Sequence, residues 1–306
     1  CAPENPLTPR VQANRIWARM FGRGLVETEE DFGRQGTVPT HPELLDALAA
    51  RWLSDEGRLR PFLKRLLMTD AWRRTSSATP EALAVDPRNE RLARFPRVRL
   101  EPEVLRDQAL AVSELLVRTK HGPPVYPPQP DGVWRSPYND ARWTNSTGDD
   151  RFRRSVYTYW KRTAPHPTMT LFDAPSREVC TSRRLATNTP LQALVGLNDP
   201  IFQEAALGFG RRIQGLSGDE RDQLVQAFRL LTGREPSLPE VQRLQDTLHQ
   251  ARRHYADRPE EAAAFLAAFA EARRVKVGRD MSAEEESAWA LVASVLLNLD
   301  EVLCRG

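Results

Sequence analysis

The sequence has few of the residues that bind metals and haem. It contains three cysteines, Cys1, Cys180 and Cys304, and neither a C-x-x-C pair nor a C-x-x-C-H haem attachment motif. This spacing argues against a zinc site, an iron–sulfur cluster or a c-type haem within the chain. Cys1 and Cys304 would pair only if the two ends of the chain meet, which would leave Cys180 as the odd thiol.

Long apolar runs and a strong charge of either sign are also missing. No run approaches the length of a membrane span. A net charge of +3 is too small to create the field of a nucleic-acid-binding protein, so we expect neither a membrane span nor a nucleic-acid partner. The chain opens on Cys1 with no initiator Met and no signal segment, so we expect it to be a piece of a longer protein.

Lysine is scarce among the 44 basic residues, because only Lys64, Lys120, Lys161 and Lys276 are lysines. Two explanations remain open. One is a GC-rich genome. The other is a preference for arginine in bidentate contacts with carboxylates, sulfates or phosphates.

The apolar periodicity is mostly that of helices, and 306 residues suffice for one large domain or two of ordinary size. We predict a mainly α-helical fold, a multi-helix bundle with a long central irregular insertion and little β-structure. We expect residues 1–121 to form its N-terminal helical part, 122–189 the insertion and 190–306 a C-terminal helical bundle, all within one composite domain. Helices are expected within 5–26, 40–52, 60–74, 103–117, 189–198, 201–214, 219–231, 237–255, 262–274 and 282–303.

Capping residues predict where several of these helices begin. Thr8 followed by Pro9 is typical of an N-cap with proline at the first helical position. Capping boxes, in which two side chains bond the first free amides, are expected at Thr40 with Glu43, Thr189 with Gln192, Ser237 with Glu240 and Ser282 with Glu285.

Residues 122–150 contain six prolines and no apolar period, which predicts a long irregular loop. Its aromatic residues argue for order. Trp134, Tyr138 and Trp143 form either a stacking platform for sugar rings or anchors that pin the loop to the helices. The β-branched and aromatic run 153–160 predicts a short strand.

Polar groups are densest in residues 157–189. One interpretation is an anion or sugar site, with arginine and lysine donors and the amides at the N-terminus of the helix that follows. The other is a salt-bridge network that ties Asp173 and Glu178 to the helical body. The candidate ligand-binding residues are Trp134, Trp143, Lys161, Arg162, Arg177, Arg183, Arg184 and Asn188.

Three residues of this segment are candidates for catalysis. His166 and Asp173 would act as an acid/base pair, and Cys180 as a nucleophile, if the fold brings them within hydrogen-bond reach. The alternatives are a histidine that fixes a proline-rich loop and a structural cysteine. His249 and His254 are too poorly spaced to share a metal, so no metal site is expected.

Several collinear segments resemble the DUF1553, or PSD1, family. They include NPLTPRVQANRIWARMFGRGLV, FPRVRLEPEVLRDQAL, GPPVYPPQPDGVW, RRSVYTYWKRTAPHPTMTLFDAPSREVCTSRRLATNTPLQALVGLNDPIF and VASVLLNLDEVL. The resemblance runs from about residue 5 to residue 303. The positions that match recurrent sequence motifs of the family are Lys161, Arg162, Asp173, Arg177, Cys180, Arg183, Asn188 and Asn198.

The resemblance implies a setting more than an activity. Such domains form the C-terminal part of exported planctomycete-type proteins, after a DUF1549 domain and often an upstream cytochrome c domain that would carry haem c, with no cofactor in this chain. Neighbouring DUF1501 proteins are implied partners, and polysaccharide breakdown is the implied process. We therefore expect a periplasmic or surface module that binds or processes a carbohydrate or another anionic ligand. The alternative is a structural domain, without catalytic activity, that docks the cytochrome domain or a partner protein.

Overall fold

The computed structural model describes residues 5–130, 132–133, 142–277 and 280–306. These residues form fifteen α-helices and, within the described ranges, a single two-stranded sheet, which confirms the predicted mainly α-helical class. The chain divides into two compact units. The first extends to Val98 and includes 180–183 and 304–306, and the second comprises 99–179 and 184–303.

The first unit is built around aromatic side chains. Trp17 and Phe21 are one helical turn apart and stack at 4.0 Å between ring centroids, and Phe62 is 1% exposed beside them. Gly22 ends the first helix with φ +74°, a left-handed conformation that glycine adopts at no steric cost. The helices of this unit are α1 (Leu7–Phe21), α2 (Pro42–Ser54), α3 (Leu59–Leu67), α4 (Asp70–Arg73) and α5 (Pro80–Val85).

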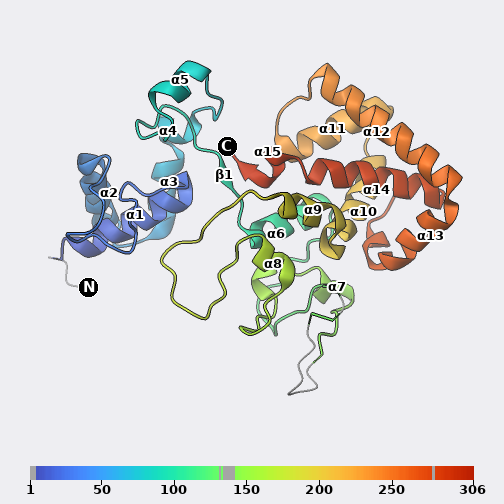
Figure 1. Ribbon diagram of the computed structural model, residues 1–306, viewed down its shortest axis with the longest axis horizontal. Coiled ribbons are helices and arrows are strands. Elements are labelled where there is room, and N and C mark those ends of the chain that lie inside the picture. Colours follow the sequence, from blue (N-terminus) through green and yellow to red (C-terminus); the bar gives the residue numbers. More distant parts are fainter. Residues whose placement is uncertain (1–4, 131, 134–141, 278–279) are drawn as a thin grey trace. The chain divides into compact units, whose positions relative to one another are not determined.

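The second unit packs several helices around α14, as Figure 1 shows. Its helices are α6 (Pro102–Val112), α7 (Gly148–Arg151), α8 (Pro167–Leu171), α9 (Pro190–Asn198), α10 (Pro200–Gln214), α11 (Glu220–Thr232), α12 (Leu238–Asp257), α13 (Pro259–Ala268), α14 (Ala283–Leu297) and α15 (Asp300–Leu303). Two 3₁₀ helices cover Ser155–Tyr157 and Ala270–Arg274. The strands β1 (Val98–Arg99) and β2 (Cys304–Arg305) pair with each other.

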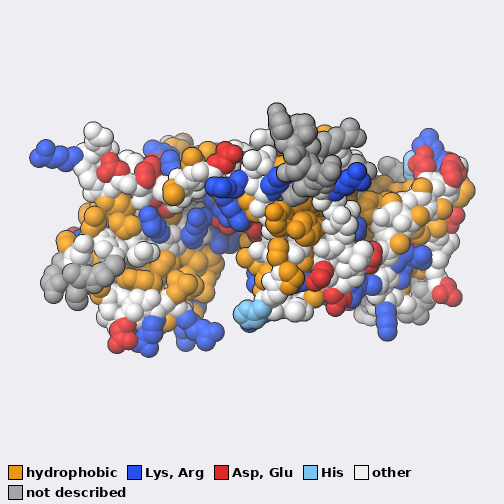
Figure 2. Space-filling model, turned by 90° about the horizontal axis from the view of Figure 1, so that it is seen from below, with side chains coloured by type: hydrophobic (Ala, Val, Ile, Leu, Met, Phe, Trp, Pro, Cys, Tyr) orange, Lys and Arg blue, Asp and Glu red, His pale blue; other side chains and the backbone are white. Residues whose placement is uncertain are grey.

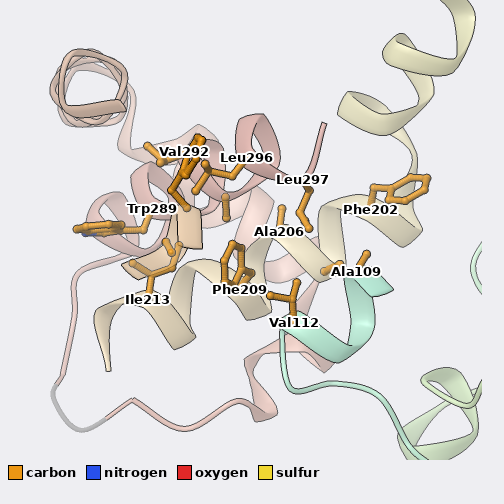
Figure 3. Packing of buried hydrophobic residues seen from close by; sticks show 14 of the residues in the cluster. Ala109, Val112, Phe202, Ala206, Phe209, Ile213, Trp289, Val292, Leu296 and Leu297 are labelled. Carbon is orange, nitrogen blue, oxygen red and sulfur yellow. The ribbon is translucent and has the colours of Figure 1, made fainter. Parts of the chain in front are cut away.

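The core of the second unit lies between α10, α14 and α6 (Figure 3). Trp289 of α14 is 1% exposed, and Phe209 and Ile213 of α10 are fully buried. A Cβ atom on Gly210 would lie 2.8 Å from the backbone nitrogen of Ala290, so glycine lets the two helices approach closely. Each large apolar side chain buried here contributes roughly 1.5–3 kcal/mol to stability.

Most of the predicted helix starts are confirmed. The Ser237 and Glu240 capping box forms both of its bonds at the start of α12. The Thr189 side chain accepts a hydrogen bond from the N–H of Gln192 at α9, but the Gln192 side chain donates to Asp173 and Thr187 and does not complete the predicted capping box. Ser282 caps α14 in the same way.

Two predicted caps in the first unit are wrong. The helix begins before Thr8, and the Asn5 side chain accepts from the N–H groups of Leu7 and Thr8 at 2.9 and 3.2 Å. Thr40 instead donates its backbone N–H to the carbonyl of Leu25, so a tertiary contact has displaced the expected capping box.

The strand predicted at 153–160 is also wrong, because residues 155–157 turn into a 3₁₀ helix. Isolated parallel bridges flank this turn, from Val117 to Arg153 and from Val125 to Thr158. The chain is therefore held by single contacts at either end and not by a continuous ladder.

Candidate functional site

A buried arginine organises the loop-rich segment of the second unit. Arg106 of α6 is 2% exposed and donates to the carbonyls of Arg153 and Arg151 at 2.7 and 2.8 Å, and to the hydroxyl of Ser155. Burial lowers the pKa of Arg106 to about 10, so it stays charged at neutral pH. Its fork of donors thus fixes the chain where it turns into the 3₁₀ helix.

Two buried carboxyl groups lie in the same network. Arg151 pairs with Glu204 at 2.6 Å, and the side chain of Glu204 is 2% exposed. Asp199 accepts from the hydroxyl of Thr168 at 2.5 Å and from the N–H of Ile201 at 2.9 Å. Burial raises the pKa values of both Glu204 and Asp199 despite these partners.

His166 is fully buried beside this network. Its Nε2 lies 3.1 Å from the carbonyl oxygen of Pro128, so Nε2 carries the proton and donates. The ring contacts Trp143 edge to face, with centroids 5.5 Å apart. Burial lowers the pKa of His166 to about 4, and the imidazole is therefore neutral at pH 7. These contacts are those of a histidine that fixes a loop.

Asp173 and His166 bond to different partners. One carboxylate oxygen of Asp173 accepts from the N–H and the hydroxyl of Thr187, both at 2.8 Å, and from the amide of Gln192 at 3.2 Å. Asp173 itself has φ +65°, a conformation that aspartate tolerates better than most residues. Cys180 is exposed in the part of the segment that belongs to the first unit.

Two of the predicted ligand-binding arginines have structural partners. Arg184 donates to both carboxylate oxygens of Glu103 at 2.7 and 3.1 Å, and to Glu101 at 3.1 Å. The guanidinium of Arg177 lies 4.5 Å from the ring centroid of Trp160. These contacts favour the salt-bridge network among the two interpretations of the segment, and ligand binding by these arginines stays a prediction.

The other predicted residues are spread along the segment. Trp143 donates its indole N–H to the carbonyl of Pro127 at 2.8 Å, which anchors the loop as one alternative proposed. Arg183 is exposed and donates to the carbonyl of Glu27 within the first unit. Lys161 is half-buried, Arg162 and Asn188 are exposed, and Trp134 lies outside the described residues.

A groove of about 550 Å³ opens at another place in the second unit. It runs between α6, the chain that follows α6 and the 3₁₀ helix held by Arg106, and its volume is in the range of ligand-binding clefts. Its described lining consists of Glu103, Val104, Asp107, Gln108, Ala111, Leu116, Arg118, Thr119, Lys120, Arg154, Val156 and Tyr157.

Both acidic residues of the groove are neutralised by arginines. Asp107 accepts from Arg154 at 2.9 Å and from the N–H of Ser155 at 2.6 Å, and the hydrogen bond that Arg154 donates to Asp107 raises the pKa of Arg154. Burial acts to raise the pKa of Glu103, but the hydrogen bonds from Arg184 and from its own backbone outweigh it, and the net shift is downward. Both carboxyl groups therefore already have arginine partners.

Arg118 and Lys120 supply positive charge that nothing nearby balances. Both side chains are exposed, and neither forms an ion pair or a hydrogen bond to another residue of the described ranges. On the face of the molecule drawn in Figure 2, basic and acidic side chains are intermingled. The excess charge at the groove is thus a local property that the small net charge of the chain conceals.

Sequence reasoning missed the groove residues Arg118, Lys120, Arg154 and Tyr157. The available signal was a pair of basic residues after a predicted helix, but that helix was expected to continue to residue 117. It ends at Val112, and residues 118–120 are exposed along the groove.

The described ranges hold no group of three or more His, Cys, Asp or Glu residues arranged to bind a metal ion. Among the same residues, no helix has both the length and the apolar character needed to cross a membrane.

Comparison with known proteins yields one match. The family model described as "PSD1: Protein of unknown function (DUF1553)" matches residues 1–248. No curated protein and no solved structure matches the chain.

Proposed function

Because the chain belongs to the PSD1 family of proteins of unknown function (DUF1553), which supplies no activity, we propose a function from the groove: the protein is a binding module for an anionic ligand. The observation that carries the proposal is the unbalanced charge of Arg118 and Lys120 beside an aliphatic floor. That floor comes from Val104, Ala111, Leu116 and Val156. A ligand with negative groups and some apolar surface complements both features.

Binding is favoured over catalysis by the state of the ionisable groups. A general acid or base needs a group that can exchange a proton with the substrate near neutral pH. In the groove, Glu103 and Asp107 already accept hydrogen bonds from arginines, which occupy the groups that could otherwise take a proton from a substrate. His166 and Asp173 are absent from the described groove lining and bond to backbone and side-chain groups elsewhere.

The resemblance supplies a setting for this proposal. An exported module linked to a DUF1549 domain and a c-type cytochrome would meet acidic or sulfated polysaccharides outside the cytoplasm. In that setting the haem belongs to the cytochrome domain, and this chain contributes ligand binding. Carbohydrate is one chemical class that carries the required negative groups.

The proposal is tested by thermal unfolding of the full chain with acidic and neutral ligands of equal length, such as oligogalacturonate, polyglutamate and a neutral oligosaccharide. A ligand that binds the native state raises the melting temperature. We expect a rise with at least one acidic ligand and none with the neutral one, and the rise should shrink as salt is added. The double variant Arg118→Glu/Lys120→Glu should lose the rise.

Arg243 is exposed on α12 and away from the groove lining, so the double variant Arg243→Glu/Arg253→Glu makes the same charge change elsewhere. It should keep the rise in melting temperature. An equal loss in both double variants would mean that net charge, and not the groove, attracts the ligand.

A second candidate function, the docking of a partner domain, is favoured by α9. Leu191, Leu194 and Leu197 lie along one side of this helix and are 59%, 56% and 40% exposed. Apolar side chains grouped in this way are typical of protein interfaces. If α9 docks the proposed cytochrome domain, Leu191→Ser with Leu194→Ser should weaken binding of that purified domain without lowering the stability of the chain. Unchanged binding would exclude this face.

A further inference from the structure

We infer that the ligand of the groove is an extended peptide segment with alternating acidic and aliphatic side chains, which adds to the chain at Arg118–Lys120 as a further strand. This inference rests on the proposed function, since it names the ligand of the same groove. It is carried by the backbone of these residues together with the charges and the aliphatic floor already described.

Arg118, Thr119 and Lys120 line the groove, and their backbone groups have no hydrogen-bond partners among the described residues. These are three consecutive exposed residues, each with an N–H donor and a C=O acceptor. A run of unpaired backbone groups is what an edge strand offers to an incoming peptide.

Both ends of this short segment are fixed. On one side, the N–H of Val117 donates to the carbonyl of Phe152 at 3.0 Å. On the other, the N–H of His121 donates to the hydroxyl of Tyr157 at 2.8 Å, and the Arg153 guanidinium donates to the carbonyl of His121. The guanidinium of Arg153 also lies 4.1 Å from the ring centroid of Tyr157. The segment is therefore held in place before a peptide arrives, which lowers the entropy cost of pairing.

The side chains of the groove select the composition of the peptide. In an extended peptide, successive side chains point to opposite sides, so one set meets the groove floor while the other does not. Val104 and Val156 are 45% and 71% exposed and would be covered by aliphatic side chains. Arg118 and Lys120 lie at the same groove and would pair with acidic side chains.

A saccharide would complement the aliphatic floor and the unpaired backbone groups of the groove less well than a peptide. Sugar rings pair with aromatic faces, whereas four of the apolar lining residues are aliphatic, and the one aromatic residue, Tyr157, already stacks with Arg153. A sugar also does not present the regularly spaced N–H and C=O groups with which an extended peptide pairs along the edge of a strand.

The test is fluorescence anisotropy with a dye-labelled, end-capped peptide of eight residues that alternates Glu and Val. A second peptide of the same sequence is N-methylated at alternate residues, so that it keeps its charge and side chains but loses backbone donors. Oligogalacturonate is the acidic saccharide probe. All three are measured on the full chain and on the Arg118→Glu/Lys120→Glu and Arg243→Glu/Arg253→Glu variants.

We expect the first peptide to bind and the N-methylated peptide to bind at least roughly tenfold more weakly, which corresponds to the loss of about one good contact. The groove double variant should weaken binding by more than about tenfold, and the α12 double variant should leave it unchanged. Thermal unfolding of each variant checks that it is folded.

Other outcomes separate the two proposals. If oligogalacturonate binds in a groove-dependent way and neither peptide does, or if N-methylation has no effect, the peptide inference is overturned and anion binding stands. If no acidic probe responds to the groove double variant, both the inference and the proposed function fail.

Discussion

The helical core and the loop-rich segment 142–173 belong to the same unit but are held together by different forces. In the core, Trp289, Phe209 and Ile213 are buried against other apolar side chains. The segment is held instead by polar contacts from outside it: buried Arg106 of α6 donates to the carbonyl of Arg153, and buried Asp199 accepts from the hydroxyl of Thr168. The core tolerates conservative apolar changes, whereas each polar contact in the segment depends on a particular donor and acceptor.

The comparison shows that a segment rich in polar residues can owe those residues to the stability of the fold and not to catalysis. The arginines, histidine and aspartate of the segment look like a catalytic set when read in order along the chain. In three dimensions, His166, Asp173 and Arg183 bond to backbone groups that a long loop cannot satisfy by itself. The groove lies beside this network, where the same loop leaves two cations and an unpaired run of backbone at the surface.

The largest effect is expected in the core. Trp289→Ala should lower the free energy of unfolding by about 3–5 kcal/mol, because it removes a fully buried indole and leaves a cavity. Urea unfolding followed by circular dichroism measures this loss. Leu191→Ala on the exposed side of α9 is the control, and it should change stability by less than about 0.5 kcal/mol.

The next effect tests the polar network. Arg106→Met keeps the length and apolar stem of the side chain but leaves the carbonyls of Arg151 and Arg153 without their donor, at a cost of about 3 kcal/mol. Hydrogen exchange should rise in residues 151–158 and stay low in α12. Arg253→Met on exposed α12 should be neutral. If exchange rises equally in residues 151–158 and in α12, Arg106 does not stabilise the loop-rich segment locally, and the proposed difference between segment and core is contradicted.

The third effect is a pH dependence caused by His166. Its pKa is about 6.5 when unfolded and about 4 when folded, so the unfolded state binds more protons between these values. Stability is therefore lost as pH falls, by about 2 kcal/mol between pH 8 and pH 5. The raised pKa values of Asp199 and Glu204 act in the opposite direction as they protonate, so the wild type alone does not isolate the histidine.

The variant His166→Gln keeps an amide donor for Pro128 but cannot titrate. The stability advantage of the wild type over this variant should shrink as pH falls from 8 to 5, as measured by urea unfolding at each pH. A constant difference for His166→Gln would contradict the burial of a neutral imidazole.

The smallest effect is expected at Asp173. Asn keeps a carbonyl acceptor for Thr187 and Gln192 and tolerates a positive φ, so Asp173→Asn should cost only about 1 kcal/mol through loss of charge-assisted bonds. Thermal unfolding measures this loss. Asp173→Leu, which has no acceptor and strains the backbone, should cost clearly more. Equal losses would argue against the hydrogen bonds as the role of Asp173.

The helical part of the fold was predictable because its signals are local. Apolar periodicity gave the helices of residues 200–257, and the Ser237 capping box placed the start of α12. Predictions failed where a distant residue decides the outcome. Thr40 bonds to Leu25, and the expected strand at 153–160 is replaced by a turn to which Arg106 bonds from α6.

The candidate site was less predictable for the same reason. Residue types identified groups able to do chemistry, but their partners come from far along the chain, as with Arg184 and Glu103. The groove residues Arg118 and Lys120 carry no motif. Their importance comes from the end of α6 at Val112 and from a neighbouring turn more than thirty residues later.

The most direct test of the central claim is to map where an anionic ligand binds. Hydrogen exchange of the full chain, with and without the acidic peptide or oligogalacturonate that raises its melting temperature, gives this map. The account predicts protection of residues 117–121 and 153–158, lost in Arg118→Glu/Lys120→Glu. Protection confined to 174–189, around Arg177, Arg183 and Asn188, would contradict it and place the ligand in the segment first suggested by the sequence.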